Sequence, residues 1–108
     1  MKKIIILLSL LMTLCTVSYA SVEVPETIKI KLENSEIIEL QLDEYLYGVV
    51  KKEMGTSYKT NGERKDIDIE AYKAQAVASR SYAVYNIINS KYDGYDMTST
   101  VKDQVYEQ

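Results

Sequence analysis

The chain has 108 residues, with 13 lysines and arginines against 16 aspartates and glutamates, and its formal net charge is −3. This acidic balance argues against a nucleic-acid-binding protein, because such binding depends on basic contacts to phosphate groups. The sequence has no histidine, and its one cysteine is Cys15, so we expect no metal site, no cofactor and no disulfide.

Residues 1–20 have the pattern of an export signal. A basic start, Met1-Lys2-Lys3, precedes an apolar run from Ile4 to Leu14, and Ser18-Tyr19-Ala20 ends in a small-x-small cleavage pattern. The apolar run is shorter than the ~20 residues of a spanning helix, so we expect a signal peptide, with an uncleaved N-terminal anchor as the alternative. Residues 21–108, with 11 basic and 16 acidic side chains, would then form one small exported domain.

Two short strands are predicted next. Residues 27–32 alternate apolar and polar side chains, as do residues 38–42, which is typical of half-buried strands. The segment between them, Glu33-Asn34-Ser35-Glu36, has the composition of a turn. The pattern therefore predicts an N-terminal β-hairpin.

A first helix is predicted over residues 43–54, with Asp43 as its N-cap. Leu46, Val49 and Val50 form an apolar stripe at i, i+3, i+4 spacing. Gly48 inside this helix costs about 0.5–1 kcal/mol relative to alanine. We therefore expect another part of the chain to pack closely against Gly48.

Glu53 places an acid within that apolar stripe. It follows Leu46 by seven residues and stands in the last turn of the helix, where the helix dipole opposes a carboxylate. Partial burial and an unfavourable dipole raise the pKa of a carboxyl group, which is how proteins prepare a general acid. Glu53 is therefore a candidate catalytic residue at the edge of a groove, and the alternative is a frayed helix end with Glu53 in solvent.

A second, longer helix follows a polar segment. Residues 55–65 contain Asn61 and Gly62 and are expected to form an exposed loop. Asp66 or Asp68 then caps a helix from Ile69 to about residue 90. Apolar side chains cover most of the circumference of this helix, so we expect it to be largely buried.

Polar residues of this second helix fall on two faces. Lys73 and Arg80 share one face, and Gln75, Ser79 and Tyr82 share its neighbour. A buried guanidinium needs an acidic partner or a ligand. Arg80 therefore has two interpretations, a structural pair with a core carboxylate or a substrate-orienting role close to Glu53.

The tail, residues 91–108, is polar, and its segment 101–106 has the composition of a strand start. The elements together predict an α+β fold, in which an N-terminal β-hairpin is followed by two helices, the second long and largely buried. The chain stops without a terminal element, so we expect an incomplete domain.

Three runs of the sequence together resemble a known family. They are Leu42–Val50 leading to Glu53-Met54, then Ala71–Ala83, then Gln104-Val105-Tyr106. In this order they resemble the stage II sporulation protein D family, which includes the amidase-enhancer proteins of cell-wall metabolism. The resemblance covers about residues 28–106, the N-terminal part of the family's domain. Its most specific part is the Lys-Ala-Gln-Ala-Val-Ala-x-Arg run of the second helix.

The resemblance implies an extracytoplasmic protein, secreted or membrane-anchored, that acts on peptidoglycan in sporulation or cell-wall remodelling. The sporulation protein is a lytic transglycosylase that cuts glycan strands already stripped of their stem peptides. By this resemblance Glu53 is the catalytic acid/base, and Lys73 and Arg80 are substrate-binding residues. One acid/base suffices for such a reaction, whereas a hydrolase uses a second carboxylate. The implied partners are glycan strands and a cell-wall amidase or other sporulation cell-wall proteins.

The sequence also departs from the family pattern. Gly55 stands where the family has proline, and the connection between Glu53 and Lys73 is longer than usual. Some members bind zinc through cysteine and histidine near the Gln-x-Tyr run, but here Asp103 precedes Gln104, so we expect no metal there. The alternatives to an enzyme are a non-catalytic module that enhances a partner amidase and an inactive truncated remnant.

Overall fold

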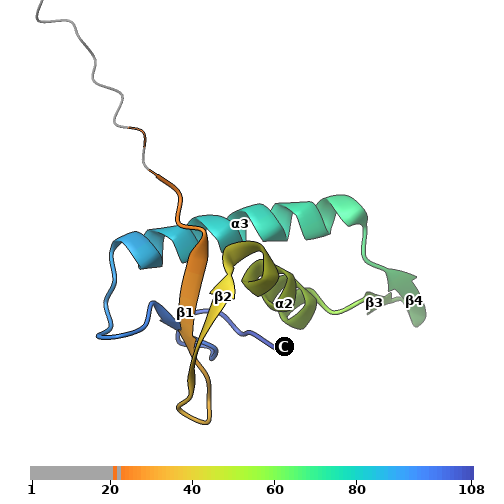
Figure 1. Ribbon diagram of the computed structural model, residues 1–108. Helices are drawn as coiled ribbons and strands as arrows, with labels where there is room; N and C mark the ends of the chain where they lie inside the picture. Colours follow the sequence, from red (N-terminus) through yellow and green to blue (C-terminus); the bar gives the residue numbers. More distant parts are fainter. Residues whose placement is uncertain (1–20, 22) are drawn as a thin grey trace, which may run out of the picture.

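This computed structural model describes residue 21 and residues 23–108, which form an α+β fold, as predicted (Figure 1). The elements in chain order are β1 (Thr27–Lys31), β2 (Ile37–Gln41), α2 (Leu42–Met54), β3 (Ser57–Thr60), β4 (Glu63–Asp66), α3 (Ile69–Ile88) and β5 (Met97–Thr98). The predicted signal peptide or anchor, residues 1–20, lies outside the described residues. Within the described part of the chain, no helix is long and apolar enough to cross a membrane.

The main sheet has the strand order β2-β1-β5. β1 and β2 form the predicted antiparallel hairpin, with Ile28 opposite Leu40. β5 pairs in parallel with the other edge of β1, placing Met97 opposite Ile30. Ile28, Ile30 and Met97 are fully buried and form the sheet side of the core. The strand expected within residues 101–106 is not formed, because the tail pairs with β1 earlier, at residues 97–98.

The N-cap of helix α2 lies two residues before the predicted one, so the prediction of Asp43 as N-cap is wrong. Gln41 occupies the N-cap position without a side-chain hydrogen bond. The backbone N–H of Leu42 donates to the carbonyl of Glu26 at 2.8 Å, so the residue just before β1 satisfies a donor at the helix start. The chain passes from β2 into α2 without a connecting loop, and Leu42 at this junction is buried.

Gly48 is packed as closely as expected, and the tail supplies its neighbour. A Cβ atom at this position would lie 2.6 Å from the backbone oxygen of Glu107 and would overlap the ring of Tyr106. The Tyr106 ring in turn stacks on Tyr45, with centroids 5.4 Å apart. Glycine therefore lets the C-terminal segment lie directly on α2.

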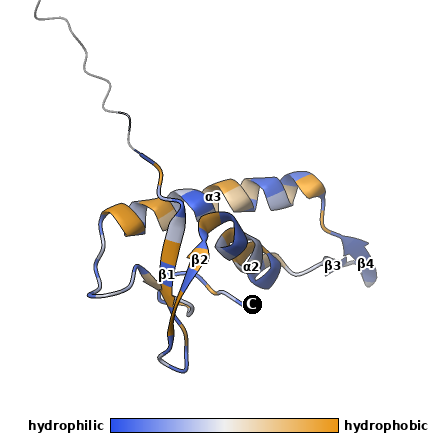
Figure 2. Ribbon diagram, viewed as in Figure 1, coloured by the Kyte–Doolittle hydropathy of each residue, from blue (hydrophilic) through white to orange (hydrophobic). Residues whose placement is uncertain are grey.

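The segment expected to be a loop is a second hairpin, β3–β4. Asn61 and Gly62 have φ angles of 50° and 82° and make its turn, a dipeptide that favours two-residue hairpins. The side chains of β4 are all exposed, and Figure 2 colours this strand as hydrophilic. The prediction of exposure was right and that of an irregular loop was wrong.

Helix α3 is capped by Asp68, whose carboxylate accepts from the backbone N–H of Glu70 at 2.8 Å. The prediction that α3 is largely buried is wrong, because only Ser79, Ala83 and Asn86 are buried. Side chains elsewhere on the helix, such as Val77 at 67% exposure, face solvent. The sheet and α2 lie along one side of α3, so the apolar residues of its other faces have no cover within the described chain (Figures 1 and 2).

Candidate functional site

Glu53 stands at the C-terminal end of α2 with its side chain exposed to solvent. Its atom Oε2 accepts a hydrogen bond from Nε2 of Gln75, which reaches across from α3. Leu46 and Val49 of the same stripe are buried, but Glu53, at the end of the stripe, lies beyond the buried core. An accessible acid is therefore joined to a polar group of the second helix, but the partial burial expected for Glu53 is not found.

A line of polar groups continues inward from Glu53, and we call Glu53, Gln75, Ser79, Gln104 and Tyr45 the polar line. Nε2 of Gln75 also donates to Oγ of Ser79 at 3.2 Å. The backbone oxygen of Ser79 accepts from Nε2 of Gln104 at 3.4 Å, and Oε1 of Gln104 accepts from the Tyr45 hydroxyl at 3.1 Å. The polar line therefore connects α2, α3 and the tail.

The inner end of the polar line is buried. Ser79 is 1% exposed, Gln104 6% and Tyr45 0%. Burial raises the pKa of the Tyr45 hydroxyl, and the negative charges of Asp103 and Glu53 raise it further. Tyr45 is therefore protonated near neutral pH and acts as a hydrogen-bond donor to Gln104.

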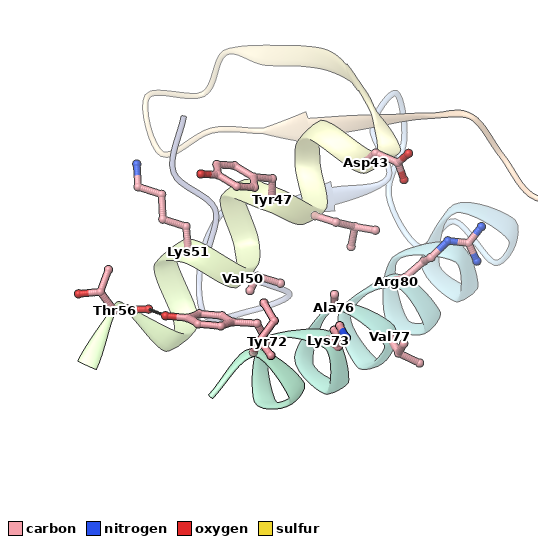
Figure 3. Close-up of a pocket in the computed structure, with 13 residues that line it drawn as sticks. Asp43, Tyr47, Val50, Lys51, Thr56, Tyr72, Lys73, Ala76, Val77 and Arg80 are labelled. Carbon is pink, nitrogen blue, oxygen red and sulfur yellow. Dashed lines mark hydrogen bonds between the residues drawn. The ribbon is translucent and has the colours of Figure 1, made fainter. Parts of the chain in front are cut away.

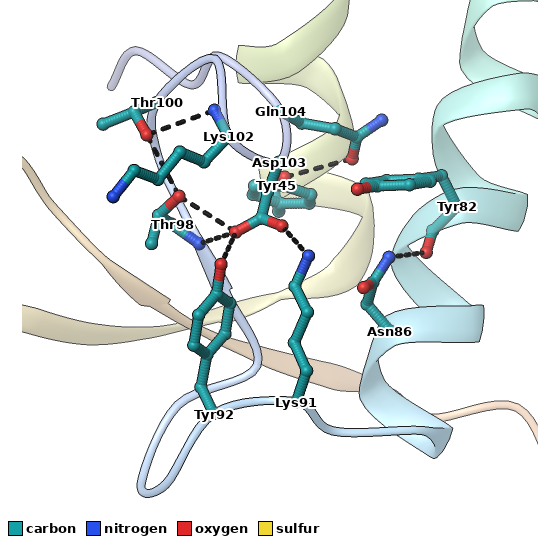
Figure 4. Close-up of polar contacts among 10 residues, drawn as sticks. All are labelled: Tyr45, Tyr82, Asn86, Lys91, Tyr92, Thr98, Thr100, Lys102, Asp103 and Gln104. Atoms are coloured by element: carbon teal, nitrogen blue, oxygen red, sulfur yellow. Dashed lines mark hydrogen bonds and ion pairs between the residues drawn. The ribbon is translucent and has the colours of Figure 1, made fainter.

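Asp103 fixes the segment that carries Gln104 (Figure 4). Its carboxylate accepts from the backbone N–H and hydroxyl of Thr98 at 2.8 and 2.9 Å and from the hydroxyl of Tyr92 at 3.0 Å, and it forms an ion pair with Lys91. Burial alone would raise the pKa of Asp103, but the hydrogen bonds from Lys91, Thr98 and Tyr92 outweigh it and hold the pKa below its ordinary value. Asp103 is therefore an ionised anchor for the tail.

A separate groove of about 690 Å³ lies between α2 and α3 (Figure 3). Its lining is mostly apolar and aromatic, with the charged side chains of Lys51, Lys73, Arg80 and Asp43 among it. Lys73 pairs with Glu70 at 2.8 Å on the exposed surface of α3. Arg80 is exposed and has no ion pair within the described residues, so the buried structural pair considered for it is not formed.

The structure brings Lys73 and Arg80 to the same groove, but it does not bring either to Glu53. Glu53 is not among the residues that line the groove. Arg80 shares the groove and a neighbouring hollow with Asp43. Asp43 precedes Glu53 by ten residues, which is about 15 Å along a helix axis. Arg80 therefore lies toward the opposite end of α2 from the acid.

Sequence reasoning missed the cluster around Asp103. The bonds from Lys91, Tyr92 and Thr98 depend on the path of the tail, for which no periodic pattern gave a signal. The spacing of Gln75 and Ser79 indicated only that they share a face of the helix. That this face meets Glu53 could not be predicted without knowing the position of α2.

In the described part of the chain, no group of three or more histidine, cysteine, aspartate or glutamate side chains is arranged to hold a metal ion.

Comparison with known proteins gives one family and one related chain. The model of the family described as stage II sporulation protein (SpoIID) matches residues 31–108. An uncharacterized protein of Brachyspira hyodysenteriae (strain ATCC 49526 / WA1) is 41% identical over 69 residues, which are 63% of this chain and 16% of that relative. The chain therefore spans less than a fifth of the relative's length. No solved structure matches this chain.

Proposed function

The chain belongs to the stage II sporulation protein D family, which supports a sporulation role related to the cell wall, and we propose that it is a lytic transglycosylase. The proposed substrate is a peptidoglycan glycan strand that carries no stem peptides. Such a polymer lies outside the cytoplasm, so the proposal includes export through residues 1–20, as a cleaved signal or as an anchor.

The placement of Glu53 carries this proposal. A general acid for a polymer must be able to reach the glycosidic oxygen and must be held at a defined position. Glu53 is exposed at the end of α2, and its Oε2 is held by Gln75 from α3. These two residues come from two of the three runs that resemble the family.

One carboxyl group accounts for both proton transfers of the reaction. Protonated Glu53 donates its proton to the glycosidic oxygen while the bond from that oxygen to C1 of the muramic acid breaks. The muramic acid 6-hydroxyl oxygen then bonds to C1, and its proton passes to the Glu53 carboxylate. The product ends in a 1,6-anhydro ring, no water is consumed, and Glu53 returns to its protonated form.

Lys73 and Arg80 would bind the strand away from the cleaved bond. Both line the groove between α2 and α3, where the exposed ring of Tyr47 adds an aromatic surface. Cations suit the carboxylates that muramic acid carries, and aromatic rings suit sugar faces. A polymer can contact this groove and Glu53 at the same time, which a small substrate could not do across the length of α2.

The proposal is tested by incubating the protein with purified peptide-free glycan strands and analysing the products by mass spectrometry. We expect anhydro-muramoyl ends from the wild-type chain and none from Glu53→Gln, because glutamine keeps the shape but cannot donate the proton. Glu44→Gln is the matched control, since Glu44 is an exposed acid of the same helix. Product formation by Glu53→Gln at the wild-type rate would refute the role of Glu53.

The surface of α3 favours a second candidate, a non-catalytic module that enhances a partner cell-wall amidase. Ile69, Val77 and Tyr85 are 63%, 67% and 64% exposed. Helix α3 therefore presents exposed apolar side chains of the kind that mark interaction surfaces. This candidate is distinguished by adding the protein to a purified amidase with peptide-bearing peptidoglycan. Stimulation that survives Glu53→Gln, without glycan cleavage by either protein, would favour it over the enzyme.

A further inference from the structure

Gln75 is the one side chain of α3 within the described residues that is hydrogen-bonded to Glu53. We propose that Gln75 is a positioning residue, which fixes the Glu53 carboxyl group so that its free oxygen, Oε1, carries the catalytic proton. This inference rests on the proposed function, because it assigns a role within the same reaction.

The bonding of the Gln75 amide determines the orientation of Glu53. A glutamine NH₂ group has two hydrogens. The bonds from Nε2 to Glu53 Oε2 and to Ser79 Oγ use both of them. The amide therefore cannot rotate without breaking one of the two bonds. Oε2 of Glu53 is held by this amide, and Oε1 remains available for proton exchange with the substrate.

The support of Gln75 is buried, although Glu53 itself is exposed. Ser79 is 1% exposed, and its backbone oxygen accepts from Gln104. Gln104 is held in turn by Tyr45. The neighbouring Asp103 anchors this part of the tail. The tail therefore has a role in the site through Gln104, although the Gln104-Val105-Tyr106 run carries no catalytic group. Gln104 supports Ser79, the residue of α3 that is hydrogen-bonded to Gln75.

Without this support Glu53 would sample many rotamers. A free glutamate side chain populates many rotamers, and ordering it costs conformational entropy. Misplacing a catalytic group by about 1 Å reduces the rate by on the order of 100-fold. We therefore expect removal of the Gln75 amide to lower kcat by about 10- to 100-fold, with KM unchanged because the groove that binds the strand is intact.

The first experiment measures kcat and KM for the release of anhydro-muramoyl ends by the full chain. Gln75→Leu keeps the approximate size and removes the donor, and Ser79→Ala removes one of the two bonds that hold the amide. Ser81→Ala is the matched control, because Ser81 lies two residues further on α3 and its hydroxyl bonds the backbone of Val77. We expect a large fall in kcat for Gln75→Leu, a smaller one for Ser79→Ala and none for Ser81→Ala. A wild-type kcat in Gln75→Leu would overturn the proposal.

The second experiment detects the contact without enzyme activity. The side-chain amide resonance of Gln75 in a ¹⁵N-edited NMR spectrum should move in Glu53→Gln and stay in place in Glu44→Gln. A Gln75 resonance that is indifferent to Glu53→Gln would overturn the positioning role even if the enzyme is active. Failure of the wild-type chain to cleave glycan would instead refute the proposed function and the catalytic role inferred from it, whatever the NMR spectrum shows.

Discussion

Alanine at position 48 would place a methyl group where the tail crosses α2. The added Cβ atom would lie 2.6 Å from the backbone oxygen of Glu107 and would overlap the Tyr106 ring. A backbone oxygen cannot rotate away as a side chain can, so the tail itself must move. The substitution therefore separates the intrinsic preference of a helix for alanine from the cost of this contact.

The two effects have opposite signs. Alanine is about 1 kcal/mol more favourable than glycine inside a helix. Forcing extra volume into a packed site costs about 1–3 kcal/mol, and displacing Tyr106 also loses its stacking on Tyr45, which is worth about 0.5–1.5 kcal/mol. We expect the packing terms to win, so that Gly48→Ala lowers the free energy of unfolding by about 1–3 kcal/mol.

The assay is urea denaturation of the full chain followed by circular dichroism, for Gly48→Ala, Tyr106→Ala and the double variant. Because part of the clash is with the Tyr106 ring, Gly48→Ala should destabilise the protein less in the Tyr106→Ala background, although the contact with the Glu107 backbone oxygen remains. A Gly48→Ala protein that is more stable than the wild type by the helix-propensity difference would refute the reasoning. It would show that the tail does not lie on α2 in solution.

Two further predictions concern charged side chains. Asp103→Asn should lower the free energy of unfolding by about 2 kcal/mol at pH 7, because it weakens several hydrogen bonds to a charged group. The folded-state pKa of Asp103 lies below its ordinary value, so its contribution is present above that ordinary value and is lost as the pH falls through the folded-state pKa. Urea denaturation at pH 7 and pH 3 should accordingly show a smaller difference between Asp103→Asn and the wild type at pH 3, and an unchanged difference would contradict the assignment. Arg80→Lys should raise KM for glycan strands severalfold with no change in Tm. The reason is that Arg80 is exposed and free of ion pairs within the described residues, so its planar guanidinium is available to the substrate and does not stabilise the fold. A variant with a lower Tm and a normal KM would show a structural role instead.

Local patterns were sufficient to predict the first hairpin and both helices. The alternation in residues 27–32 and 38–42 and the stripe in α2 describe which side chains one surface can bury, and the structure buries or partly buries them. The Asn61-Gly62 dipeptide was a hairpin signal, but the flanking strands are too polar to alternate, so β3 and β4 were read as a loop. For α3, apolar residues on all faces could not indicate which face a neighbour would cover.

The candidate site was predictable where it depended on one helix face. Gln75 and Ser79 share a face by spacing, and that face meets Glu53. The expected approach of Arg80 to Glu53 depended instead on where along α2 the second helix crosses, which no spacing within α3 determines. The cluster at Asp103 depended on a tail whose order comes from pairing with β1, a contact between distant parts of the chain.

The most direct test of the proposed chemistry is cleavage of peptide-free glycan in water enriched with a heavy oxygen isotope, followed by mass spectrometry of the new chain ends. A lytic transglycosylase closes the anhydro ring with the sugar's own hydroxyl, so the account predicts ends that carry no heavy oxygen and are lighter than hydrolysis products by one water. Glu44→Gln should give the same ends, and Glu53→Gln should give none. New reducing ends that contain the heavy isotope would show attack by water and would contradict the proposed single-acid mechanism.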